Sequence, residues 1–289
     1  MVGMPCWNAL NARVHSRSIP TDPAQRAPGI RLSYNRALPG IFSGLGFWGE
    51  YTPFNQTVRQ NGEQYNLEAR DARGGLSYKV YLLGGDGHYL AAGGGINGQR
   101  IDQSSTFTES GDTLAENLQE FRLQFDAGVH YNYGSLNLFL HGINLSATNY
   151  QGTSGLAYPV FAPRRYEAEA NYYFLTLFRS QLIPRARYSF VDESRYENAT
   201  EPGPQFLLLG GRYIYDNFLL LGAAYQPELA LANAPRGVVR QFYPEWTFEA
   251  GLLVLGRFRL TYQYLQTAAG EVSSGTEFTE HRFSLQINW

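Results

Sequence analysis

Polar and apolar residues alternate without a break along residues 121–133, whose sequence is FRLQFDAGVHYNY. This period of two predicts a β-strand, because successive side chains of a strand point to opposite faces. Strands of soluble domains usually run about 5–6 residues, whereas a membrane-spanning strand needs about 9–11. The pattern therefore favours a transmembrane strand, with one apolar face made by Phe121, Leu123, Phe125, Ala127, Val129, Tyr131 and Tyr133.

Similar alternation recurs along the chain and predicts an all-β fold, a single antiparallel transmembrane β-barrel. The predicted strands are 28–36, 42–52, 66–83, 88–99, 119–132, 136–145, 165–176, 181–190, 204–215, 217–227, 241–254, 257–266 and 280–289. Bacterial single-chain barrels have an even number of strands. We therefore expect a fourteenth strand at 8–17, within an N-terminal segment 1–27, and one domain over 1–289.

The predicted connections are of two kinds. Tight turns rich in Gly, Asp and Asn are expected near 84–87, 133–135, 177–180, 216–217 and 255–257. Longer polar connections are expected at 18–27, 53–65, 100–118, 146–164, 191–203, 228–240 and 267–279. Short turns on one side and long loops on the other are typical of an outer-membrane barrel. With fourteen strands, both termini are expected on the periplasmic, short-turn side.

Composition narrows the class of protein further. The formal net charge is −2 and the sequence pI about 6.2, which gives no indication of nucleic-acid binding. No segment reaches the roughly 18 apolar residues of a membrane helix, and the mean hydropathy of −0.32 excludes only helical membrane proteins. No signal peptide is recognisable at the start. Cys6 is the only cysteine, which rules out an intrachain disulfide, and we expect it to be an inert thiol.

The last nine residues, HRFSLQINW, alternate as cleanly as 121–133. Arg282, Ser284, Gln286 and Asn288 are expected to face the lumen. A terminal aromatic residue after alternating apolar positions resembles the signal by which the barrel-assembly machinery recognises outer-membrane proteins. The residues of this predicted assembly signal, expected to face lipid, are Phe283, Leu285, Ile287 and Trp289.

Four charged residues lie on the predicted lumen faces of two neighbouring strands. Glu167 and Glu169 precede a predicted turn, and Arg185 and Arg187 follow it. In an antiparallel hairpin these pairs can lie opposite one another. We interpret them as a charge ladder that replaces water inside the barrel; a charge-selective constriction is the functional alternative.

The other candidate sites give little indication of chemistry. GLGFWG at 44–49 and GGGING at 93–98 match G-x-G-x-x-G, but no helix is expected after either, so nucleotide binding is not predicted. His130 and His141 are both predicted to face inward, without the further ligands that a metal site needs. Asp126 and His130 are four residues apart on one strand, about 13 Å, too far to act together. We predict no enzyme activity, no cofactor and no metal.

The order of several motifs resembles the PorP/SprF family of Bacteroidota outer-membrane proteins. The motifs are IRLSYNRALPGIFSGLGFWGEY (30–51), RDARGGLSYKVYLLGGDGHYLAAGGGINGQRID (70–102), FDAGVHYNYGSLNLFLHGINLS (125–146), LIPRARYSF (182–190) and EHRFSLQINW (280–289). Together they span about 28–289. Leu38 stands where the family usually has an aromatic residue before the proline.

This resemblance implies a role in type IX secretion and gliding motility at the cell surface. It implies an outer-membrane protein that anchors or helps to export a large secreted cargo or adhesin, recognised through the cargo's C-terminal domain. It also implies contact with periplasmic ring or peptidoglycan-associated subunits, and no catalytic residues. The alternative hypothesis is a passive channel for small solutes, since fourteen strands leave room for a lumen cavity.

Overall fold

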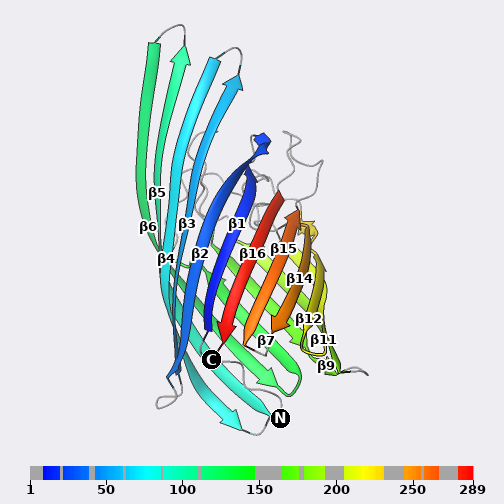
Figure 1. Cartoon of the computed structure of the whole chain (residues 1–289). Helices are drawn as coiled ribbons and strands as arrows, with labels where there is room; N and C mark the ends of the chain where they lie inside the picture. The colour runs from blue at the N-terminus through cyan, green and yellow to red at the C-terminus, as the bar shows by residue number, and fades with distance from the viewer. Residues whose placement is uncertain are drawn as a thin grey trace.

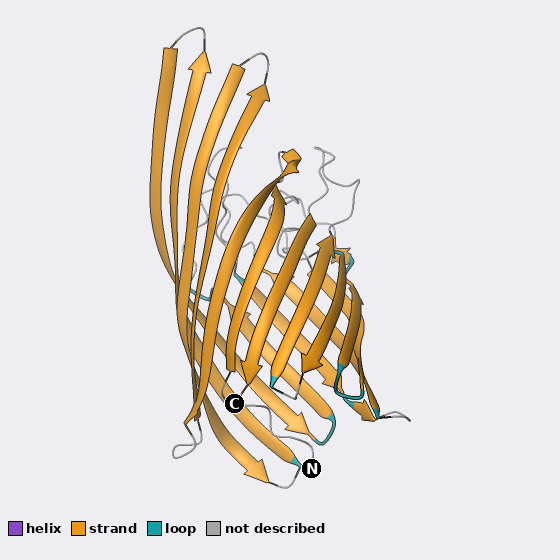
Figure 2. Cartoon of the chain, in the orientation of Figure 1, coloured by secondary structure: helices purple, strands orange, loops and turns teal. Residues whose placement is uncertain are grey.

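All strands that the structure describes belong to one antiparallel sheet (Figures 1 and 2). The computed structural model describes residues 9–19, 22–38, 43–60, 63–85, 87–109, 112–146, 164–175, 179–192, 205–230, 244–254, 257–266 and 279–288. No helix within these ranges is long and apolar enough to cross a membrane. The strands are β1 (Ala9–Ile19), β2 (Asp22–Leu38), β3 (Ser43–Gln60), β4 (Glu63–Gly85), β5 (His88–Glu109), β6 (Asp112–Tyr133), β7 (Leu136–Ile143), β8 (Arg165–Tyr172), β9 (Phe174–Leu175), β10 (Ser180–Val191), β11 (Gln205–Tyr215), β12 (Leu219–Tyr225), β13 (Glu228–Ala230), β14 (Trp246–Val254), β15 (Phe258–Gln266) and β16 (Thr279–Asn288).

The sheet closes into a barrel of fourteen strands, as predicted. β8 and β9 form one barrel strand, because both pair with β10. β12 and β13 form another, because both pair with β11. The ring closes where β1 pairs with β16, from Ala9 opposite Asn288 to Arg17 opposite Glu280. β1 therefore provides the strand that was expected at 8–17, and its pairing removes the two edges that an open sheet would expose.

Both ends of the described chain lie at the same end of the barrel (Figure 1). Six connections at this end join strands separated by only two to four residues, and they include every predicted tight turn. Asp216 and Asn217 both have positive φ, 47° and 53°. Asp and Asn accept this left-handed conformation more readily than most residues, which explains why the β11–β12 turn can be so short.

Three predicted long loops are wrong, because strands occupy most of their residues. β3 continues to Gln60 and β4 begins at Glu63, so 53–65 is largely a hairpin. β5 continues to Glu109 and β6 begins at Asp112, which replaces the loop expected at 100–118. Likewise β1 and β2 are separated by two residues within the expected loop 18–27. The other four predicted loops fall mostly outside the described residues.

β3, β4, β5 and β6 form two tall hairpins that rise beyond the other strands (Figure 1). β4 has 23 residues, roughly 75 Å at the usual rise per residue, whereas about 9–11 tilted residues cross a bilayer. A long hairpin satisfies its backbone hydrogen bonds internally, so its strands need no apolar face outside the membrane. For that reason the polar composition of 53–65 and 100–118 was a poor indicator of loop structure.

The two faces of the barrel wall divide as the alternation predicts. Phe121 and Tyr133 are 65% and 63% exposed, and the residues between them on the same face are also exposed on the outer surface. Gln124, on the opposite face, is 4% exposed. An exposed apolar outer surface suits contact with lipid, while the polar and charged side chains fill the lumen.

Candidate functional site

The predicted lumen residues of β8 and β10 do form ion pairs, but with a diagonal pattern. Arg187 lies directly opposite Glu169, and Arg185 directly opposite Asn171. Arg185 Nη2 nevertheless donates to Glu169 Oε2 at 2.5 Å, and Arg187 Nη1 lies 3.9 Å from Glu167 Oε2. Each arginine therefore contacts a glutamate two residues away from the residue directly opposite it. The sequence alone could not specify this diagonal pairing. Whether these residues act as a charge ladder or as a constriction stays a prediction.

A second ion pair crosses an entire strand of the wall. Arg212 on β11 donates from Nε to Glu249 Oε2 on β14 at 2.6 Å, although β12 lies between them. The residue of β12 paired with both is Gly222. A Cβ there would lie 3.3 Å from both Arg212 Cγ and Glu249 Oε2. Because Gly222 has no side chain, the Arg212 guanidinium group can pass across β12 to reach Glu249.

The Glu169–Arg185 and Arg212–Glu249 ion pairs both line one lumen cavity of about 260 Å³. The cavity is lined by both partners of each short ion pair, together with Gly222. Opposite charges are thus balanced within the cavity itself, which agrees with the ladder interpretation better than with a constriction of one sign. The residues that carry the charges are Glu169, Arg185, Arg212 and Glu249.

A third ionic centre lies near the seam where the barrel closes. Glu50 on β3 lies 3.5 Å from Arg13 Nη2 and 3.3 Å from Arg31 Nη1. Its other oxygen lies 3.8 Å from His15 Nε2, and the His15 ring is 2% exposed. His15 Nε2 also lies 3.3 Å from Thr52 Oγ1, a contact that passes over Gly29 of the intervening strand. Sequence reasoning missed this centre, because its members are spread over three strands.

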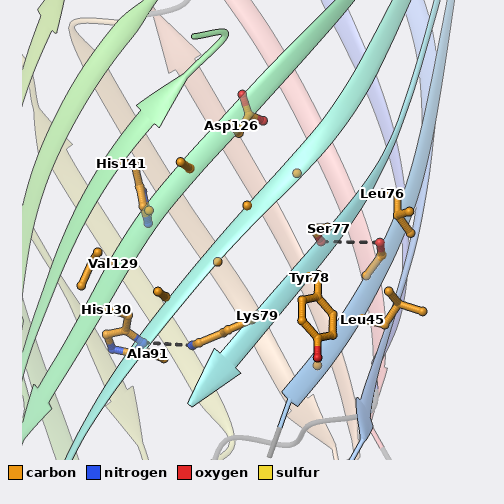
Figure 3. A pocket seen from close by; sticks show the side chains of 18 of the residues that line it. Leu45, Leu76, Ser77, Tyr78, Lys79, Ala91, Asp126, Val129, His130 and His141 are labelled. Carbon is orange, nitrogen blue, oxygen red and sulfur yellow. Dashed lines mark hydrogen bonds between the residues drawn. The ribbon is translucent and has the colours of Figure 1, made fainter. Parts of the chain in front are cut away.

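A mostly uncharged polar cluster lies near the short-turn end of the lumen (Figure 3). Lys79 Nζ on β4 lies 3.2 Å from His130 Nδ1 on β6, and the intervening strand β5 presents only Ala91 and Gly93 between them. His130 Nε2 lies 3.0 Å from Asn137 Oδ1 on β7. The Tyr89 hydroxyl lies 3.3 Å from the same nitrogen. Only His130 of this cluster was singled out from the sequence.

The remaining candidates from the sequence do not combine into a reactive site. Phe139 stacks on His130, with ring centroids 4.0 Å apart, and lies between His130 and His141. Asp126 accepts hydrogen bonds from Asn97 Nδ2 and from the Asn144 backbone N–H, both at 2.8 Å. Within the described ranges, no group of three or more His, Cys, Asp or Glu side chains could hold a metal ion. Both G-x-G-x-x-G segments lie inside strands, β3 and β5.

The residues of the predicted assembly signal lie on the last strand, β16. Phe283 and Leu285 are exposed on the outer face, 59% and 38%. Ile287 lies on the same face of the strand. On the lumen face Arg282 pairs with Glu280, and Ser284 lies within hydrogen-bond distance of Thr261. Trp289 and Cys6 lie outside the described residues. The role of Phe283, Leu285, Ile287 and Trp289 in assembly stays a prediction.

The family model described as type IX secretion system membrane protein PorP/SprF matches residues 58–283. This range covers more than three quarters of the chain and includes three of the five motifs that carried the resemblance in full, and the first four residues of the last motif. No curated protein matches the sequence.

Solved structures of outer-membrane barrels share the fold. The TodX deltaS2S3 mutant, a monoaromatic hydrocarbon channel, is 9% identical, with a TM-score of 0.60 over 99% of this chain and 91% of that chain. The toluene transporter TodX of Pseudomonas putida is also 9% identical, with a TM-score of 0.55 over 97% and 87%. CdiB from Acinetobacter baumannii is 11% identical, with a TM-score of 0.50 over 98% and 60%. At these identities the likeness establishes the barrel fold alone.

Proposed function

Because the chain belongs to the PorP/SprF family of type IX secretion system membrane proteins, we propose that it is an outer-membrane barrel of the type IX secretion and gliding machinery. In this role it anchors a secreted cargo protein at the cell surface or assists its export, and it connects to periplasmic components. The family match over 58–283 is the observation that carries the proposal. In agreement with a role without catalysis, Glu50, Glu169 and Glu249 contact arginines, and Asp126 accepts hydrogen bonds from two amides.

The two ends of the barrel suit two kinds of partner. The short-turn end also holds the start of β1 and the end of β16, and we assign it to the periplasm, facing ring or peptidoglycan-associated subunits. The tall hairpins β3–β4 and β5–β6 rise from the opposite end. They extend well past the height that a bilayer requires, so we assign them to contact with the C-terminal domain of the cargo.

Shortening the hairpins tests this assignment. Replacing 57–66 with Asn-Gly would leave Gln56 opposite Leu67, and replacing 106–115 with Asn-Gly would leave Ser105 opposite Glu116. Each replacement removes an even number of residues from each strand, so every remaining side chain keeps its face. Asn-Gly is the preferred two-residue hairpin turn. We expect a normally folded barrel, shown by heat-modifiable migration on gels, that still purifies with periplasmic subunits but no longer with the cargo.

The full-length protein provides the control for this experiment. Affinity purification from native membranes should recover a large secreted protein together with periplasmic ring subunits. Recovery of the barrel alone in every such purification would contradict the proposed function. Cargo that remains bound to the shortened barrel would contradict only the assignment of the hairpins.

A passive channel for small solutes is the second candidate, favoured by the two lumen cavities. The cavities measure about 580 and 260 Å³, and both are lined by polar and apolar residues. Conductance across a planar bilayer separates the two proposals. A steady single-channel conductance without any bound protein partner would favour the channel, and its absence would favour the secretion role.

A further inference from the structure

Lys79 is the only lysine in a chain that has 22 arginines. It lies on β4 with its side chain on the lumen face, beside a cavity of about 580 Å³ (Figure 3). We propose that this cavity binds a small organic anion, with the Lys79 ammonium group holding the carboxylate of that anion. The proposal does not depend on a role in secretion.

The first argument is the missing counter-charge. Among the described residues, no carboxylate lies within ion-pair distance of Lys79. The one carboxylate in the lining of this cavity, Asp126, already accepts one hydrogen bond at each oxygen. A half-buried ammonium group without a counter-charge is costly. Thirteen of the described arginines, by contrast, each reach a carboxylate: Arg13, Arg31, Arg70, Arg73, Arg100, Arg164, Arg165, Arg179, Arg185, Arg187, Arg212, Arg259 and Arg282.

The second argument is that the hydrogen bonds around His130 leave Lys79 donors free. Asn132 Nδ2 donates to the Leu136 carbonyl and to Asn137 Oδ1. This contact identifies Asn137 Oδ1 as an acceptor, so His130 Nε2, 3.0 Å away, carries a proton and donates to it. His130 Nδ1 is then the acceptor of the neutral ring and receives one N–H of Lys79. An ammonium group has three N–H donors, so two remain for a ligand.

The shape of the cavity indicates the body of the ligand. Its wall includes three glycines on the lumen faces of β5 and β6: Gly93, Gly95 and Gly128. Without side chains, these positions present backbone to the lumen. The rings of Trp48, Phe139 and His141 also line the cavity, and so do the charged residues Arg36 and Asp126. A flat, largely apolar molecule fits between a backbone wall and aromatic rings, and a single carboxylate would complement the single lysine.

The cavity lies close to the end of the barrel with the short turns. Lys79 lies six residues before Gly85, the last residue of β4, and His130 lies three residues before Tyr133, the last residue of β6. Tyr81 and Tyr89 lie beside Lys79, with its Nζ 5.2 and 5.9 Å from their ring centroids. A ligand would therefore reach Lys79 from that end of the lumen, passing two tyrosines.

Acylation of the lysine tests the proposal, because Lys79 is the only ε-amine. The full-length protein in detergent micelles is treated with an amine-acylating reagent, and modification at Lys79 is followed by mass spectrometry. Benzoate is the probe, and benzamide is its neutral counterpart of the same shape. We expect benzoate to slow acylation of Lys79 saturably, by at least about fivefold, because an occupied carboxylate site shields the amine. The α-amino group of the same molecule is the internal control and should react at an unchanged rate.

Equal protection by benzoate and benzamide, or protection by neither, would overturn the proposal. Protection by inorganic phosphate as strong as that by benzoate would overturn the assignment to an organic anion. Calorimetric titration provides a second measurement. Lys79→Met should abolish benzoate binding, whereas Lys79→Arg should retain it with a changed affinity. Since both variants can be checked for folding by heat-modifiable migration, unchanged benzoate binding by a folded Lys79→Met barrel would also refute the site.

Discussion

Arg212 and Glu249 form an ion pair across an intervening strand, with Arg212 Nε 2.6 Å from Glu249 Oε2 and Gly222 at the paired position between them. Two other contacts follow the same plan. His15 reaches Thr52 over Gly29, and Lys79 reaches His130 across Ala91 and Gly93. In each case a small residue on the middle strand lets two outer strands share a polar contact. Glycine in this wall therefore decides which lumen side chains can meet.

Gly222→Leu should break the Arg212–Glu249 pair, because the new side chain would occupy the path of the guanidinium group. Glu249 is largely buried and would lose its shortest contact, keeping only Arg259 at 3.7 Å. Separating a buried pair costs about 3–5 kcal/mol; since Arg212 is 40% exposed, we expect a loss of about 2 kcal/mol. Urea-induced unfolding in detergent micelles measures it.

The neighbouring substitution Ala223→Leu is the matched control. Ala223 lies next to Gly222 on β12 but is exposed on the outer face, so an added apolar side chain there would meet detergent or lipid. We expect its free energy of unfolding to stay within about 0.5 kcal/mol of the wild-type value. Equal destabilisation by the two substitutions would contradict the role assigned to Gly222.

Glu50→Gln should destabilise the barrel more than any single exposed carboxylate. Arg13 and Arg31 occupy directly paired positions on β1 and β2, and Glu50 lies between 3.3 and 3.5 Å from both. Without its charge, two arginines would face one another in the lumen, next to the β1–β16 seam. We expect a loss of about 3 kcal/mol in unfolding experiments.

Glu68→Gln is the control for Glu50. Glu68 also contacts an arginine, Arg70, but both side chains are more than half exposed, and such pairs contribute about 0–1 kcal/mol. A similar effect of the two substitutions would show that the Glu50 centre does not stabilise the closed barrel.

The alternation of residues such as Phe121 and Tyr133 was enough to predict the fold, because period two and strand length are local properties of the sequence. The even strand count then predicted β1, whose own pattern is weak. The tall hairpins were not predicted, although Asn61-Gly62 is a strong hairpin signal, because their polar composition was interpreted as loop. Hydrophobic pattern reports burial, and a hairpin outside the membrane buries little.

The lumen contacts were predictable only in part. Strand order predicts that Glu167 and Glu169 lie next to Arg185 and Arg187, and in the structure these side chains do contact one another; their role as a charge ladder stays a prediction. The pairing of individual residues depends on register and on rotamers. The Lys79–His130 contact and the Glu50 centre each depend on three strands at once, with a small residue on the middle strand. The one available indication was that Lys79 is the single lysine of the chain.

A double-mutant cycle on Glu169 and Arg185 should reveal whether the ladder stabilises the barrel. Glu169→Gln removes the acceptor charge, Arg185→Met removes the guanidinium group, and the double variant removes both. Because the two side chains are in direct contact, we expect a coupling free energy of about 1–2 kcal/mol in urea unfolding. The equivalent cycle on Arg187 and Glu167, 3.9 Å apart, should give a smaller coupling.

Coupling near zero in both cycles would contradict the ladder. In that case the constriction remains, and planar-bilayer recordings should then show changed ion selectivity in Glu169→Gln. A stabilising ladder predicts no such change.

Deleting Trp289 should lower the amount of barrel inserted in the outer membrane. Phe283 and Leu285 already present the apolar face of β16, and Trp289 continues the alternation at the end of the chain, where the assembly machinery would bind it. Surface levels measured by protease accessibility of intact cells should fall severalfold. Trp289→Phe keeps the terminal aromatic residue and should insert at close to the normal level. The molecules that do insert should bind cargo with unchanged specificity, because β16 ends at the other end of the barrel from the tall hairpins. Normal surface levels of the truncated protein would show that its last residue is not part of the signal.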